Sequence, residues 1–128
     1  MKSNISMKNG TVKSGEFTYS RTPRVLKAYG SEYTIPVRTV EFDEKLTQAA
    51  KTISETATMS TSDTVLAIRE GIALFIGEEE VERIFPKEKL MELDVDEIIS
   101  FWQALNYELK AAQNELLAKY RPSATVRR

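Results

Sequence analysis

The apolar residues between Val95 and Tyr120 recur at steps of three and four, and this pattern restricts the fold of the 128-residue chain most strongly. The stripe comprises Ile98, Trp102, Leu105, Leu109, Ala112, Leu116 and Tyr120. Asp94, followed by Glu97, is typical of a helix N-terminal cap, and Pro122 ends the pattern. At 1.5 Å per residue this helix would be roughly 39 Å long, which exceeds the diameter of a compact domain of this size. We therefore expect a partner, or a second copy of the chain, to cover its far end.

Three shorter helical segments precede this long helix. The first places apolar residues on one face, namely Phe42, Leu46, Ala49, Ala50, Ile53 and Ala57. The second begins at Ser62 or Asp63 and ends at Gly77, because glycine favours the position that follows a helix. A short acidic segment from Glu78 to Phe85 ends at Pro86.

Two short alternating segments near the N-terminus predict a β-hairpin. The first runs from Glu16 to Ser20, with Phe17 and Tyr19 on one side, and the second places Tyr33, Ile35 and Val37 on one side. A turn is expected near Gly30–Ser31. Because Pro36 has no N–H to donate, the second strand should lie at an edge or be bulged there.

The predicted fold class is mainly α with a short N-terminal β-hairpin (α+β), with three to four helices that end in one long C-terminal helix. We expect a single domain over residues 16–120. A flexible leader, residues 1–15, should precede it, and a basic flexible tail, residues 121–128, should follow it.

The chain contains neither histidine nor cysteine, which excludes the common zinc sites and histidine-based acid–base catalysis. Carboxylates remain, in two groups: Glu78, Glu79, Glu80 and Glu82, and then Asp94, Asp96 and Glu97. The side chains of consecutive residues in a helix point in different directions, so neighbouring carboxylates such as Glu78, Glu79 and Glu80 cannot converge on one metal ion. Negative charge in the first turn of a helix is favoured by the helix dipole. Three interpretations of these acidic residues remain. In order of preference, they are solvated residues in the first turns of helices, an acidic patch that faces a partner, or ligands of a metal ion. We expect no enzymatic activity, no metal and no cofactor.

Nucleic acid and membranes are not expected partners either. The net charge is −1, the five glycines form no phosphate-binding loop, and no apolar segment approaches the roughly 20 residues that cross a bilayer. The aromatic residues Phe17, Tyr19 and Tyr29 lie near arginines, as in some sites for single-stranded nucleic acid. They also fit strand faces, which we prefer. Residues 1–10 lack the apolar stretch of a signal peptide.

Protein binding is the remaining function class, and the long helix is the expected site. Trp102 fits the helical core, but aromatic residues also anchor protein interfaces. The candidate partner-binding residues are Trp102, Leu105, Leu109, Leu116 and Tyr120. Self-association through the same stripe is possible.

The order of several short motifs resembles a known family. These are the segments 40–46 (VEFDEKL), 62–63 (SD), 75–78 (FIGE), 84–86 (IFP) and 96–102 (DEIISFW), followed by the long final helix. In this order they resemble the tail assembly chaperones of long-tailed (siphovirus-type) bacteriophages and related prophages, particularly those of Gram-positive hosts. The resemblance runs from about Thr34 to Tyr120. The basic residues Arg127 and Arg128 have no counterpart that we can assign.

The resemblance implies a protein that acts in the host bacterial cytoplasm during infection and is missing from the mature virion. Such chaperones coat the aggregation-prone tape measure protein and recruit the major tail tube protein around it. Many are also made in a longer, frameshifted form. The alternatives are a structural tail or connector component of the virion, or a small phage regulator that binds a host protein.

Overall fold

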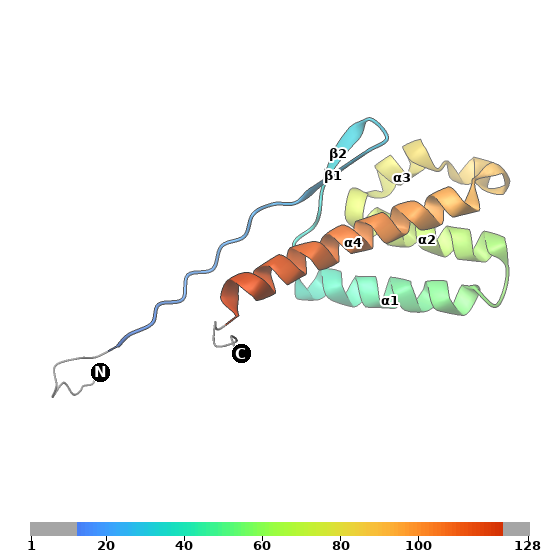
Figure 1. The fold of residues 1–128 in the computed structure, drawn as a ribbon. Helices are drawn as coiled ribbons and strands as arrows, with labels where there is room; N and C mark the ends of the chain where they lie inside the picture. Colours follow the sequence, from blue (N-terminus) through green and yellow to red (C-terminus); the bar gives the residue numbers. More distant parts are fainter. Residues whose placement is uncertain (1–12, 122–128) are drawn as a thin grey trace.

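The computed structural model describes residues 13–121, which form a β-hairpin followed by helices (Figure 1). The elements are β1 (Val25–Ala28), β2 (Ser31–Thr34), α1 (Val40–Thr56), α2 (Thr61–Ile76), α3 (Glu78–Ile84), the 3₁₀-helix η1 (Lys87–Glu92) and α4 (Val95–Tyr120). The predicted fold class is therefore confirmed. Most of the expected leader and nearly all of the expected tail lie outside the described residues.

The hairpin closes through a two-residue turn at Tyr29 and Gly30, which have φ angles of 54° and 79°. Positive φ at both positions is the backbone of a type I′ turn, and it pairs Ala28 with Ser31 across the antiparallel strands. The predicted first strand was wrong, because β2 pairs with Val25–Ala28 and residues 16–20 belong to no strand. The second strand ends at Thr34, before Pro36 could interrupt its hydrogen bonds.

Local capping groups set the ends of α1 and α2, which lie side by side in Figure 1. The hydroxyl of Thr39 accepts the N–H of Phe42 at 3.0 Å, and the hydroxyl of Ser60 accepts the N–H of Asp63 at 3.1 Å. These caps begin each helix within two residues of its expected start. Gly77 ends α2 with a φ of 92°, as predicted.

The long helix α4 has the predicted bounds, and Asp94 caps it. The Asp94 carboxylate accepts the N–H groups of Asp96 at 2.9 Å and Glu97 at 3.2 Å. In a capping box the Glu97 carboxylate would accept the backbone N–H of Asp94. Here it instead accepts the hydroxyl of Tyr29, at 2.8 Å. The 3₁₀-helix η1 between α3 and α4 was not anticipated.

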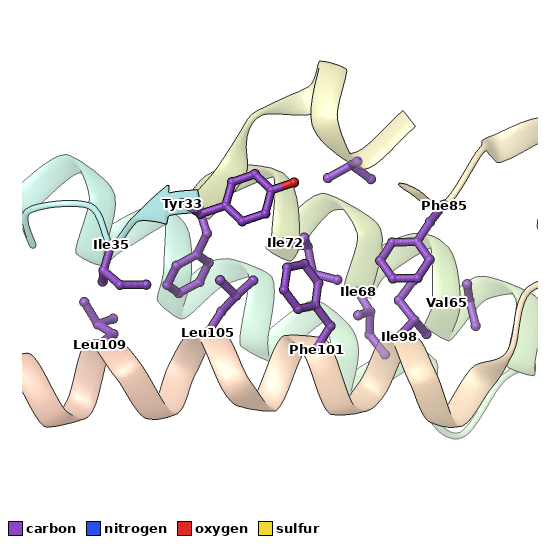
Figure 2. Packing of buried hydrophobic residues seen from close by; sticks show 12 residues of the cluster. Tyr33, Ile35, Val65, Ile68, Ile72, Phe85, Ile98, Phe101, Leu105 and Leu109 are labelled. Carbon is purple, nitrogen blue, oxygen red and sulfur yellow. The ribbon is translucent and has the colours of Figure 1, made fainter. Parts of the chain in front are cut away.

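The core lies where α4 crosses α2 under the hairpin, and Figure 2 shows its side chains from close by. Its buried members are Tyr33, Ile35, Val65, Ile68, Ile72, Phe75, Val81, Phe85, Ile98, Phe101, Leu105 and Leu109. The contribution of α4 to this cluster ends at Leu109, so the last turns of α4 lie beyond it. Within residues 13–121, no helix combines the length and the apolar character that spanning a bilayer requires.

Candidate protein-binding surface

The C-terminal end of α4 carries apolar side chains that the core does not cover. Ala112 is the last buried residue of the helix, and the red end of α4 projects beyond the α1–α2 pair in Figure 1. Leu116 and Tyr120 continue the apolar stripe there and are half-buried, whereas the neighbouring Leu117 is 52% exposed. Apolar surface therefore remains at this end of α4, beyond the core.

A segment of the same chain lies on this end, and the expectation that a partner or second copy covers it stays a prediction. The rings of Phe17 and Tyr19 have centroids 5.3 and 5.6 Å from the ring centroid of Tyr120. The N–H of Ser20 donates to the Tyr120 hydroxyl at 2.7 Å, and the ammonium of Lys119 donates to the Ser20 hydroxyl at 2.7 Å. We call residues 16–20 the strap.

The strap and the helix end enclose an open groove of about 560 Å³. Its lining residues are Phe17, Tyr19, Arg38, Gln113, Leu116, Leu117, Tyr120 and Arg121. Phe17 is 73% exposed and Tyr19 is 52% exposed, so the strap covers the helix end only in part. Apolar and aromatic side chains together with arginines are a composition typical of protein interfaces. We call this site the aromatic groove.

The contacts that hold the strap are individually weak. An aromatic pair contributes about 0.5–1.5 kcal/mol beyond its area, and a hydrogen bond contributes a net of about 0.5–1.5 kcal/mol. Ordering the backbone of each strap residue costs about 1–2 kcal/mol. The gains and the cost are therefore of similar size, and the strap is poorly secured.

The backbone N–H of Ser20, followed by its hydroxyl, lowers the pKa of Tyr120 below its usual value, because both stabilise the phenolate.

An ion-pair cluster fixes the chain just after the strap. The Nε atom of Arg24 lies 2.6 Å from a Glu108 carboxylate oxygen, and its Nη1 atom lies 3.0 Å from one of Glu115. These contacts join the residue before β1 to α4. They fix the direction from which the strap reaches the end of the helix.

The structure divides the five candidate partner-binding residues into two groups. Leu105 is fully buried and Leu109 is 8% exposed, and the side chain of Ile35 lies near Leu109 in Figure 2. The chain itself covers both side chains, and their role as partner-binding residues stays a prediction. Trp102 is half-buried against α2. Leu116 and Tyr120 are at the aromatic groove.

Six of the eight residues that line the groove were not among the candidates from the sequence, and three of the six are apolar or aromatic. Phe17 and Tyr19 were assigned to a strand, because an extended strap has the same alternation as a strand. Leu117 lies off the predicted stripe. The adjacent pair Leu116–Leu117 was the available signal, since neighbouring helical residues point in different directions and thus indicate a wider apolar surface.

The acidic residues of α3 have different surroundings. Glu78 and Glu79 are exposed, but Glu80 pairs with Arg83 at 2.8 Å and Glu82 pairs with Arg69 at 2.7 Å. Glu80 also accepts the hydroxyl of Tyr33 at 2.7 Å. The interpretation of a solvated helix start therefore does not describe Glu80 and Glu82, which join α3 to β2 and to α2. In residues 13–121, no three acidic side chains are grouped so that they could bind a metal ion.

Comparison of the chain with protein-family models, with curated proteins and with solved structures gives no match. The resemblance to tail assembly chaperones therefore depends on the order of the sequence motifs alone.

Proposed function

We propose that this chain is a phage tail assembly chaperone that binds the tape measure protein and assists assembly of the tail tube. The observation that carries the proposal is the aromatic groove, where exposed aromatic and aliphatic side chains meet at the end of a long helix. Aromatic residues and arginine are enriched in protein interfaces. The tape measure protein is named as the partner because the order of the sequence motifs resembles that of tail assembly chaperones.

The expected mode of binding is a helix that packs on the α4 side of the groove. Leu116, Leu117 and Tyr120 would contact an apolar stripe on a helix of the tape measure protein, and the groove residues Arg38 and Arg121 would fix its register. Each contact should be weak. Repetition along a very long partner would give the assembly its stability, and weak single contacts would let the chaperone leave when the tube subunits arrive.

The proposal also states where the chaperone acts and at which stage of assembly. The chaperone would act in the cytoplasm of the host bacterium, recruit the major tail tube protein and be absent from the mature virion. A stable ring of fixed stoichiometry, detected by light scattering of the purified chain, would instead indicate a structural tail or connector component.

Co-expression with the tape measure protein of the same phage tests the proposal. The natural chain should raise the soluble yield of the tape measure protein and should co-purify with it. A folded Leu116→Glu, Leu117→Glu variant should do neither, because it places two charges in the groove. The matched control is Tyr107→Glu, Ala118→Glu, which alters two exposed positions of α4 that do not line the groove.

The control variant should behave like the natural chain. No effect of the natural chain on the tape measure protein would refute the proposed function. Equal activity of the groove variant and the control variant would show that the binding surface lies elsewhere.

A further inference from the structure

The strap makes its contacts with the rest of the described chain at one place. Its aromatic contacts go to Tyr120, and its side-chain-mediated hydrogen bonds outside the strap go to Tyr120 and Lys119. The Tyr120 hydroxyl also lies 3.2 Å from the carbonyl oxygen of Thr18. One helical turn therefore holds the whole strap.

The side chain of Leu116, in the last turns of α4, lies next to the strap. It lines the aromatic groove together with Phe17 and Tyr19, and it also lines a smaller pocket together with Ser20. Its half-buried state therefore depends on residues that are about 100 positions away in the sequence. A helix that packs against Leu116 and Tyr120 together would need the surface beside Tyr120 that the rings of Phe17 and Tyr19 occupy.

We propose that residues 16–20 are a reversible intramolecular cover, which occupies the apolar end of α4 and leaves it when a partner helix binds. The partner helix itself rests on the proposed function, whereas the opening of the strap does not. The rings of Phe17 and Tyr19 use the same apolar surface that a partner would use, so strap and partner exclude each other. In the absence of a partner, the strap reduces the apolar area exposed to other molecules.

The strength of this competition follows from the fraction of time that the strap is open. The apparent affinity of a partner is its intrinsic affinity multiplied by the open fraction. A strap that is closed nine-tenths of the time would thus weaken binding about tenfold. Removing the aromatic rings of the strap should restore the full affinity.

The rate of thiol labelling measures the opening without any partner. The full chain contains no cysteine, so one introduced thiol is unique. Leu116→Cys reports on the surface beneath the strap, Ala118→Cys on an exposed position beside it, and Ala67→Cys on the core. With a maleimide reagent, the reversible cover predicts that Cys labelling is fastest for Ala118→Cys, intermediate for Leu116→Cys and slowest for Ala67→Cys.

Substitutions in the strap then test the cause of the protection. Phe17→Ser with Tyr19→Ser should raise the rate of the Leu116→Cys reporter to about that of the Ala118→Cys reporter and leave the Ala118→Cys rate unchanged. The matched control is Met59→Ser with Met91→Ser, which replaces two exposed apolar residues in the α1–α2 connection and in η1. This control should change neither rate.

A second measurement leaves Leu116 in place. Hydrogen exchange at the Ser20 amide should be slowed by its bond to Tyr120, and Tyr120→Phe should accelerate it several-fold without changing the exchange of core amides.

Three outcomes would overturn the inference: equal labelling at the Leu116→Cys and Ala118→Cys reporters, labelling at Leu116→Cys as slow as in the core, or no response to the strap substitutions. Each can occur while co-expression with the tape measure protein succeeds. Conversely, the labelling pattern can hold while co-expression fails, so the two proposals fail separately.

Discussion

The indole ring of Trp102 lies against the backbone of Gly71, where α4 crosses α2. A Cβ atom at Gly71 would stand 2.6 Å from Cζ3 and 2.8 Å from Cη2 of this ring. The same ring meets Phe75 edge-on, with 6.0 Å between the ring centroids. The missing side chain of Gly71 therefore creates the space that holds the half-buried indole, and the two helices approach closely at this point.

We expect Gly71→Ala to destabilise the fold by about 1 kcal/mol, although alanine favours helices. Overpacking costs about 1–3 kcal/mol, and the helical preference for alanine over glycine returns about 1 kcal/mol. The urea midpoint measures this change. In a Trp102→Leu background the same substitution should raise the midpoint, because the clash is gone. A raised midpoint with Trp102 present would show that the indole can move aside.

Arg69 is the only charged residue that is buried among residues 13–121, with 4% of its surface exposed. Its Nε atom donates to the carbonyl oxygen of Phe85 at 2.9 Å, and its Nη2 atom donates to the Glu82 carboxylate at 2.7 Å. Glu82 itself is half exposed and also accepts the N–H of Lys87 at 3.0 Å. The pair is therefore asymmetric, since water can solvate only the carboxylate.

This asymmetry predicts that Glu82→Ala is more harmful than Arg69→Met. Loss of the carboxylate leaves a buried positive charge without a partner, which costs about 3 kcal/mol. Loss of the guanidinium leaves one buried carbonyl group without a donor and a carboxylate that water solvates, which costs about 1–2 kcal/mol. Chemical denaturation measures both values, with the exposed Glu79→Ala as the control. The reverse order would mean that water reaches the guanidinium.

Leu105 lies at the centre of the core and has no exposed surface. We expect Leu105→Asp to unfold the domain, because a buried charge without a partner costs several kcal/mol, a large part of a typical stability of about 5–15 kcal/mol. Leu117→Asp, at a half-exposed site on the same helix, should leave the melting temperature nearly unchanged. An unchanged melting temperature of the Leu105 variant would show that the buried face of α4 is assigned wrongly.

The helices could be predicted from the sequence because their limits depend on local groups. Asp94 caps α4 through hydrogen bonds to residues two and three positions ahead, and Gly77 ends α2 through its own backbone conformation. The first strand could not be predicted in the same way. Residues 16–20 alternate as a strand does, and only the type I′ turn at Tyr29–Gly30 determines which segment pairs with β2.

The candidate site was only partly predictable, because periodicity identifies a helix face and not what covers it. Leu109 and Leu116 lie on the same stripe, yet Leu109 is buried in the core while Leu116 lies at the groove. The difference arises from the hairpin and the strap, which come from distant parts of the chain. Contacts between residues so far apart in the sequence do not change the spacing of the apolar residues within one helix.

A polar network between the hairpin and α3 gives the stability a defined pH dependence. The Tyr33 hydroxyl donates to the Glu80 carboxylate at 2.7 Å, and the Arg83 guanidinium lies 2.8 Å from the same oxygen. Arg83 also donates to the Ser31 hydroxyl at 3.2 Å. The hydrogen bond from Arg83, followed by that from Tyr33, holds the pKa of Glu80 below its ordinary value of 4.5.

A carboxyl group whose pKa is lowered by folding stabilises the folded state when it is ionised. This contribution is present above pH 4.5 and is lost as the pH falls through the lowered pKa of Glu80. Glu80→Gln should therefore lower the urea midpoint at about pH 7, whereas the exposed Glu79→Gln should not. Towards about pH 2 the midpoints of the natural chain and the Glu80 variant should converge, because a protonated glutamate and a glutamine have nearly the same shape and charge. A difference that stays constant over this range would mean that the charge of Glu80 does not stabilise the contact between the hairpin and α3.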